Sequence, residues 1–173
     1  DALLQQLLRA EEKEQAKAVE WFQTSASQDN RNGNYTLARC YVKGSGVEKN
    51  DPKAFQYYLR AAELVHSDAQ NETGRFYLNG WGVEKDDAKA LEWFRKAADQ
   101  GNKFSVYNLG FCYANGRAVQ ADKRKALQYY EKAVEMGNEG AREEADRLRE
   151  ELAGQPEEPP APAPEEPPRS APA

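Results

Sequence analysis

Apolar residues recur at helical spacing along most of the chain, most clearly between residues 67 and 101. The first run predicts a helix that ends at Gly80, because glycine readily takes the positive φ of a helix C-terminus, and its apolar face consists of Ala69, Thr73, Phe76 and Tyr77. Asp86 or Asp87 can accept hydrogen bonds from the free amides of a second helix, whose apolar face consists of Ala90, Trp93, Phe94, Ala97 and Ala98. The pattern predicts a helical hairpin that Gly101 closes.

This hairpin pattern returns every 36 residues. The turn Gly80-Trp81-Gly82-Val83 is preceded by Gly44-Ser45-Gly46-Val47 and followed by Gly116-Arg117-Ala118-Val119. At the position of Gly101 the chain repeats glycine at Gly137 but has Asp29 and Val65 in the earlier copies, which predicts looser turns there. One aromatic position recurs as Trp21, Tyr57, Trp93 and Tyr129; we expect it to be buried, so that Trp93→Ala costs roughly 3–5 kcal/mol.

A hairpin cannot bury both of its faces alone, so the repeats predict an all-α solenoid in which neighbouring units stack. We place it at residues 1–153, with units at about 31–66, 67–102 and 103–138 and helical caps at 1–30 and 139–153. Leu3, Leu4, Leu7 and Leu8 are expected to cover the first unit, and the closing helix to turn Ala141, Ala145, Leu148 and Leu152 inward. Residues 154–173 are rich in Pro, Ala and Glu, and are expected to be a disordered linker or docking tail.

The repeat resembles the Sel1-like repeat family over roughly residues 11 to 150. That family's signature is filled in the middle unit by Ala69, Gly74, Tyr77, Gly80, Gly82, Val83, Asp86, Lys89, Ala90, Trp93, Ala97, Ala98 and Gly101. Thr73 departs from the family's Leu, and Ala118 from its Gly. The tetratricopeptide repeat, with its period of about 34, fits less well. The resemblance implies a right-handed α/α superhelix that binds proteins on its concave face.

Composition and charge exclude several other classes of protein. The net charge is −5, and no basic stripe of the kind that binds phosphates is present, so we expect no nucleic-acid partner. No apolar run is long enough for a membrane span. Gly80-x-Gly82 follows no strand, which argues against a phosphate loop and a nucleotide cofactor. The compartment stays open, since the chain begins at Asp1 and a leader can have been removed.

Candidate chemistry is sparse. His66 is the one histidine, lies at a turn and is expected to be a surface residue without a metal-binding role. Cys40 and Cys112 occupy the same position two units apart, too far for a disulfide, and are expected to be apolar core residues. The cysteine-rich branch of the family, with a disulfide in each repeat, does not match. We therefore predict no catalytic or metal site, and no cofactor.

The first helix of each hairpin lines the concave face in the family, which gives the candidate binding residues. Positions that point away from the stack, together with one exposed turn residue, are Tyr35, Arg39, Asn71, Arg75, Tyr107, Asn108, Phe111 and Trp81. Aromatic residues beside arginine are typical interface anchors, although these aromatics can equally close over neighbouring helices. The sequence favours a scaffold or adaptor for a protein or peptide. The alternatives are a regulatory segment of a larger protein or a toxin-neutralising protein, and a hydrolase is the least favoured.

Overall fold

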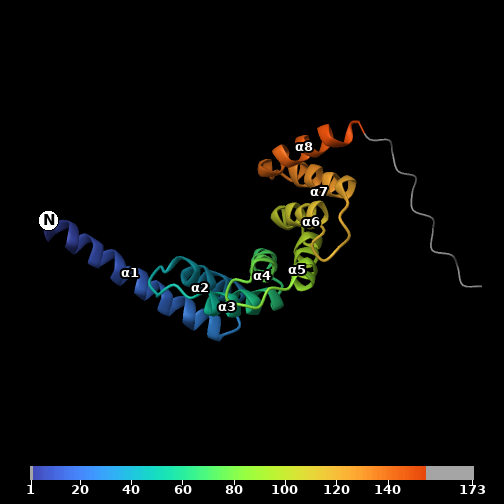
Figure 1. Ribbon diagram of the computed structural model, residues 1–173. Coiled ribbons are helices and arrows are strands. Elements are labelled where there is room, and N and C mark those ends of the chain that lie inside the picture. Colours follow the sequence, from blue (N-terminus) through green and yellow to red (C-terminus); the bar gives the residue numbers. More distant parts are fainter. Residues whose placement is uncertain (1, 155–173) are drawn as a thin grey trace, which may run out of the picture.

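Helices follow one another throughout residues 2–154, the part of the chain that the computed structural model describes (Figure 1). Within this range there are eight α-helices, one short 3-10 helix at Glu139–Ala141 and no strand. The α-helices are α1 (Ala2–Ser27), α2 (Arg31–Lys43), α3 (Asp51–Glu63), α4 (Ser67–Asn79), α5 (Asp87–Asp99), α6 (Lys103–Asn115), α7 (Lys123–Glu135) and α8 (Arg142–Leu152). The predicted all-α solenoid is confirmed. The prediction of a disordered tail concerns residues that lie outside the described range, apart from Gly154.

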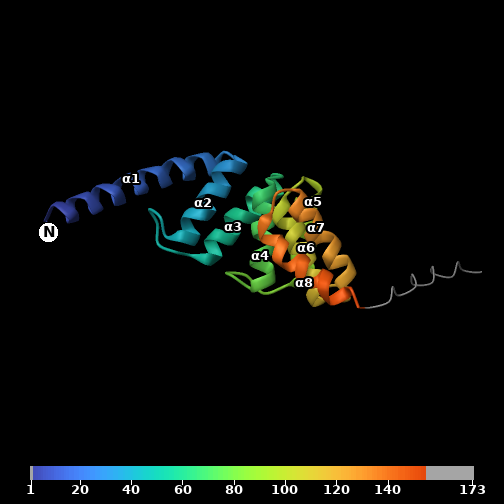
Figure 2. The ribbon, with the colours of Figure 1, turned by 90° about the horizontal axis from the view of Figure 1, so that it is seen from above.

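Three hairpins form the body of the stack: α2 with α3, α4 with α5, and α6 with α7. Each of these six helices has 13 residues, and each hairpin packs on the next through α3 against α4 and α5 against α6. Figures 1 and 2 show the stack curving along its length, with α1 extending away at one end. The first helices of the hairpins, α2, α4 and α6, therefore recur at regular intervals and form one continuous surface.

Side-chain caps fix where these helices begin. Asp86 is the residue that caps α5, since its carboxylate accepts a hydrogen bond from the Lys89 amide at 2.9 Å. The same role recurs at the start of the other hairpin helices, filled by Asn30, Asn50, His66, Asn102 and Asp122. Gly44, Gly80 and Gly116 end α2, α4 and α6 in the left-handed conformation, as predicted.

The turns between hairpins are all alike, so the prediction of looser turns at Asp29 and Val65 is wrong. Asp29 and Val65 have φ of 55° and 62°, in the left-handed region where Gly101 and Gly137 also lie. The next residue closes each turn with the same backbone bond, such as His66 N to Ala61 O at 3.1 Å and Asn102 N to Ala97 O at 3.1 Å. Stacking of the hairpins imposes this geometry whatever residue is present, and a β-branched valine is strained in it.

Replacing Val65 with glycine should therefore stabilise the protein by about 0.5–1 kcal/mol. The left-handed conformation costs a non-glycine residue roughly 1–2 kcal/mol, part of which the larger entropy of an unfolded glycine offsets. The Val65 side chain is 54% exposed, so little packing is lost. Urea denaturation measures the change, with Glu63→Gly in the last turn of α3 as a control that should be destabilising by about 1 kcal/mol. Equal losses in the two variants would show that Val65 is not strained.

The buried aromatic position is one residue later than predicted. Trp21 is 78% exposed, and Tyr57, Trp93 and Tyr129 are only partly buried. At the following position Tyr58, Phe94 and Tyr130 are 3%, 0% and 2% exposed. We call these two positions the first and the second aromatic column. The second column packs against the first helix of its own hairpin, where Gly74 and Gly110 leave room for the Phe94 and Tyr130 rings.

The two ends of the stack differ. At the C-terminal end the predicted closing helix is confirmed, since Ala141, Ala145, Leu148 and Leu152 are buried. At the N-terminal end the predicted cover is wrong, because Leu3, Leu7 and Leu8 are 65%, 58% and 50% exposed. Residues 2–14 contain neither glycine nor proline to form a turn. The chain therefore continues as one helix of 26 residues, and the N-terminal part of α1 extends beyond the first hairpin (Figure 2). The side chain of Leu4 lies outside the described residues.

The two departures from the family signature are accommodated. Thr73 is fully buried and donates from Oγ1 to the Ala69 carbonyl at 2.8 Å. Ala118 has a φ of 56° and keeps the left-handed turn that glycine makes in the other units. Both cysteines are free thiols, with Cys112 fully buried and Cys40 partly buried.

Candidate functional site

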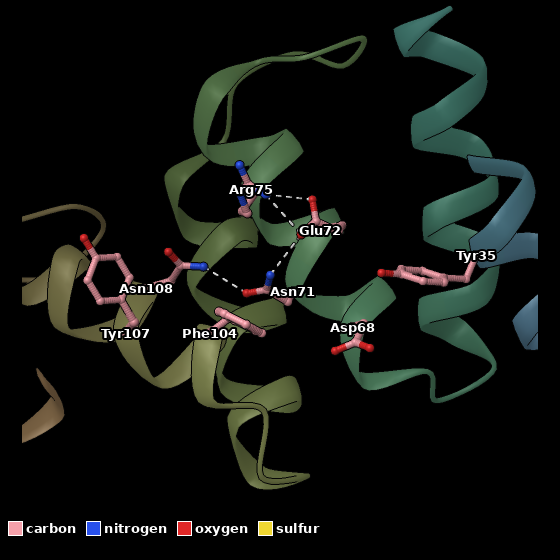
Figure 3. Close-up of a pocket in the computed structure, with 8 residues that line it drawn as sticks. All are labelled: Tyr35, Asp68, Asn71, Glu72, Arg75, Phe104, Tyr107 and Asn108. Atoms are coloured by element: carbon pink, nitrogen blue, oxygen red, sulfur yellow. Dashed lines mark hydrogen bonds and ion pairs between the residues drawn. The ribbon is translucent and has the colours of Figure 1, made fainter. Parts of the chain in front are cut away.

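A hollow of about 530 Å³ lies across the surface formed by α2, α4 and α6 (Figure 3). Each of the three helices contributes, because residues 36 positions apart occupy equivalent places on successive units. The lining residues are Tyr35 of α2, Asp68, Asn71, Glu72 and Arg75 of α4, and Phe104, Tyr107 and Asn108 of α6. We refer to this site as the α2–α4–α6 hollow.

A buried polar network forms the floor of the hollow between α4 and α6. Asn71 is 5% exposed, and its Oδ1 accepts hydrogen bonds from Ser105 Oγ and Asn108 Nδ2, both at 2.9 Å. Asn102 Nδ2 donates to Asp68 Oδ1 at 2.7 Å and joins the same two helices. Because buried amides with satisfied bonds hold a single orientation, the network fixes the relative position of α4 and α6.

A charged row continues from this network along α4. Asn71 Nδ2 donates to Glu72 Oε1 at 3.2 Å, and Arg75 Nη1 donates to Glu72 Oε1 at 3.1 Å and to Oε2 at 3.0 Å. The Arg75 guanidinium also lies 5.5 Å from the ring centre of Trp81, in the range of a cation–π contact. Figure 3 shows Asn108, Asn71, Glu72 and Arg75 connected in this order.

Aromatic rings form the two ends of the hollow. Tyr35 stacks on His66 with ring centres 4.4 Å apart and also contacts Tyr58 at 5.8 Å. Tyr107 contacts Tyr130 at 5.3 Å. Burial raises the pKa of Tyr35, and the neighbouring carboxylate of Asp68 raises it further, so the phenol stays protonated and can donate. Both tyrosines are thus held by the core while one side of each faces the hollow.

The hollow brings together five of the eight predicted binding residues: Tyr35, Asn71, Arg75, Tyr107 and Asn108. Three lie outside its lining. Arg39 is exposed and lies 5.8 Å from the Tyr35 ring centre. Phe111 is partly buried and packs against the core beneath α6, while Trp81 makes an edge contact with Phe76 at 5.6 Å.

Three lining residues, Asp68, Glu72 and Phe104, are absent from the predicted set. Asp68 and Glu72 are both on α4, at the second and sixth positions of the helix. Phe104 is 53% exposed and occupies the second position of α6, where the preceding units have Asp68 and Asn32. An aromatic residue at a position that is polar in the other units was the signal available in the sequence.

His66 has a structural role beside the hollow, which corrects its expected place on the open surface. It is partly buried, and its Nδ1 accepts the Ala69 amide at 3.3 Å as the cap of α4. Burial lowers the pKa of His66, Arg31 lowers it as well, and Asp68 acts in the opposite direction. The folded chain therefore favours the neutral imidazole, which alone can accept this bond at Nδ1.

The stability that His66 provides should depend on pH. The pKa of His66 is lower in the folded chain than in the unfolded chain. Its contribution to stability is therefore complete above the unfolded pKa of about 6.5 and is lost as the pH falls through the pKa of the folded state. In His66→Asn, an amide like those of Asn30 and Asn102 caps the helix without titrating. The free energy of unfolding of the parent should fall relative to this variant between pH 7.5 and about pH 5, by an amount on the order of 1 kcal/mol. A difference between the two proteins that is constant with pH would contradict this role.

Other kinds of site find no support in the described residues. Between residues 2 and 154, no cluster of three or more histidine, cysteine, aspartate or glutamate side chains is arranged to hold a metal ion. No helix in that range combines the length and apolar character needed to cross a membrane.

Comparison with known proteins agrees with the repeat pattern. The model of the Sel1 repeat matches residues 9–30, 32–66, 67–102 and 104–138. No curated protein sequence matches the chain. Several solved structures are similar to it. A Sel1 repeat protein from Oxalobacter formigenes has 30% identity and a TM-score of 0.76, over 83% of this chain and 59% of that one.

Two further structures come from Escherichia coli and Helicobacter pylori. A protective antigen of uropathogenic Escherichia coli with an SLR fold has 30% identity and a TM-score of 0.76, over 80% of this chain and 30% of that one. Cysteine-rich protein B of Helicobacter pylori has 29% identity and a TM-score of 0.59, over 76% of this chain and 95% of that one. This chain thus spans 59% and 30% of the first two structures. With four matched repeats that cover most of its helices, the chain belongs to the Sel1 repeat family.

Proposed function

We propose that the chain binds an extended segment of another protein in the α2–α4–α6 hollow. Sel1 repeat proteins generally act as scaffolds for protein interactions rather than as catalysts, which supports a binding role in the coarse sense. The observation that supports binding of an extended segment at this place is the hollow itself, which crosses three successive units and combines aromatic with polar side chains.

The lining suits a peptide better than a compact small molecule. Tyr35 and Phe104 offer apolar rings on different units, and Asn108 and Arg75 offer polar groups in the same hollow (Figure 3). An extended chain presents alternating side chains together with free backbone amides and carbonyls, which such a row of rings and polar groups can contact in turn. The polar network that fixes α4 against α6 limits the ordering required on binding.

Phe104→Ala should weaken this binding at least about tenfold, since half-exposed aromatic anchors contribute more than 1 kcal/mol at many interfaces. Peptides selected from a random library on the purified chain supply the ligand, and fluorescence anisotropy gives the affinities. Phe104 is 53% exposed, so its truncation should leave the melting temperature nearly unchanged. Trp21→Ala is the matched control, because Trp21 is an exposed aromatic residue outside the hollow. If selected peptides bind both variants as well as the parent, the proposal fails.

A further inference from the structure

The second half of α1 occupies the place of the second helix of a hairpin. Thirty-six residues before α3 lies the segment 15–27, in register with α3, α5 and α7. Each of those three helices packs against the first helix of its own hairpin. Among the described helices α1 packs chiefly on α2, and no first helix lies against the face of 15–27 that meets one in the other units (Figure 1).

Trp21 lies on this face without the aromatic partner that two of its equivalents have. At the same repeat position, Tyr57 stacks on Tyr41 of α2 with ring centres 5.7 Å apart, and Tyr129 stacks on Tyr113 of α6 at 5.4 Å. Trp21 has no such partner helix and is 78% exposed. Beside it lies a depression of about 480 Å³, lined by Glu20, Trp21, Thr24, Ser25 and Gln28. A helix that covers this face would thus need apolar side chains at the level of Trp21.

Residues 2–14 of α1 have the properties of such an element. The segment has 13 residues, the length of α2, α4 and α6, and it projects beyond the stack (Figure 2). Leu7 and Leu8 on it are 58% and 50% exposed. An exposed stripe at spacings of three and four continues from it to the Trp21 face: Leu7, Ala10, Glu14, Lys17, Trp21 and Thr24.

We propose that α1 of a second copy of the chain covers this face in an antiparallel arrangement. Residues 2–14 of each copy would lie along residues 15–27 of the other, where the other units have their first helix. The first and second helices of a hairpin run antiparallel, so the orientation is the same. The two-fold arrangement covers both exposed faces at once. The α2–α4–α6 hollow lies on other helices, so this inference does not rest on the proposed function.

The charges on the stripe are complementary in this arrangement. Glu14 and Lys17 lie near the middle of α1 and are paired within one helix at 3.1 Å. Antiparallel packing centred between Gln15 and Ala16, one residue from the midpoint of α1, places Glu14 of one copy opposite Lys17 of the other, so opposite charges meet twice across the two-fold axis. The interface is small, since two tryptophans of about 150–250 Å² each and four leucines make up most of its apolar area. We expect a dissociation constant in the micromolar range, roughly 1–100 μM.

Sedimentation equilibrium of the whole chain over about 1–200 μM tests the proposal. The mass should rise with concentration from 19.5 kDa toward about twice that value. Leu7→Glu should raise the dissociation constant at least about tenfold, because it places a charge in the apolar part of the interface. Gln5→Glu adds the same charge to the opposite side of the same exposed segment and should leave the dimer intact.

Charge exchange provides the second measurement. Glu14→Lys and Lys17→Glu should each weaken the dimer several-fold, and the double variant should restore it, because opposite charges again face each other. A chain that stays monomeric up to about 200 μM overturns the proposal and leaves the face of α1 to a helix from another protein. A dimer that Leu7→Glu and Gln5→Glu affect equally also overturns it, since the stripe would then not form the interface.

Discussion

Phe94→Ala should lower the free energy of unfolding by roughly 3–5 kcal/mol, the largest loss we expect from any single truncation. The Phe94 side chain is 0% exposed and packs directly on the backbone of α4, where a Cβ built on Gly74 would lie 2.6 Å from its ring. A neighbour without a side chain cannot expand into the space, so the cavity should stay open. Because Phe94 belongs to the middle hairpin, its loss should also weaken the coupling between the two ends of the stack. Urea denaturation followed by circular dichroism measures both effects.

Trp93→Ala is the control for this prediction and should cost only about 1–2 kcal/mol. Trp93 is partly buried, and one of its neighbours is the ammonium group of Lys96, 4.2 Å from the ring centre. Its removal opens a surface to water rather than a closed cavity. A loss for Trp93→Ala equal to that for Phe94→Ala would contradict this assignment, because it would show that the two aromatic positions contribute equally to the core.

The difference between these two columns shows how far the sequence predicts the fold. The period of 36 residues and the turn glycines are sufficient to place the hairpin helices, because capping and turn geometry depend on residues close together in the chain. Which of two adjacent aromatic residues is buried depends on a contact with another helix. Gly74 makes room for Phe94, and only the packing of α4 on α5 reveals that the two residues meet.

The predictions for the turn conformations and for the N-terminal end were wrong for related reasons. Val65 looks unsuited to a left-handed turn by its own preference, yet stacking of the second hairpin on the first enforces that φ. The leucines of α1 read as the cover of a core, but covering it requires a turn, and residues 2–14 contain no residue that breaks a helix.

The candidate site was predictable where the repeat register determines it. Tyr35, Asn71 and Tyr107 face the same surface because they share one position in the 36-residue unit. Asp68 and Phe104 share another position and are absent from the predicted set: the change from Asn32 and Asp68 to Phe104 singles out that position, but it does not show that Asp68 and Phe104 line a common hollow. The network from Asn108 through Asn71 to Glu72 joins two units and depends on side-chain directions that the sequence does not specify.

Gly82→Ala should lower the free energy of unfolding by about 3 kcal/mol, for two separable reasons. Gly82 has a φ of 62°, which costs alanine roughly 1–2 kcal/mol. A Cβ at this position would also lie 2.4 Å from the backbone nitrogen of Pro52, at the start of α3 in the preceding hairpin, so the two units must move apart. Thermal and urea denaturation measure the sum of these two losses of stability.

Gly101→Ala separates the two causes, because Gly101 has a φ of 80° but a Cβ there would meet nothing within 4 Å. It should show the conformational cost alone, roughly 1–2 kcal/mol. Ala118, at the position equivalent to Gly82 in the next unit, already has a side chain and a φ of 56°, so Ala118→Gly should be stabilising. A larger loss for Gly82→Ala than for Gly101→Ala would locate the excess at the junction between hairpins, where this turn rests on α3. Equal losses would mean that the junction yields to a methyl group, and the tolerance of Ala118 would then be the general property of these turns.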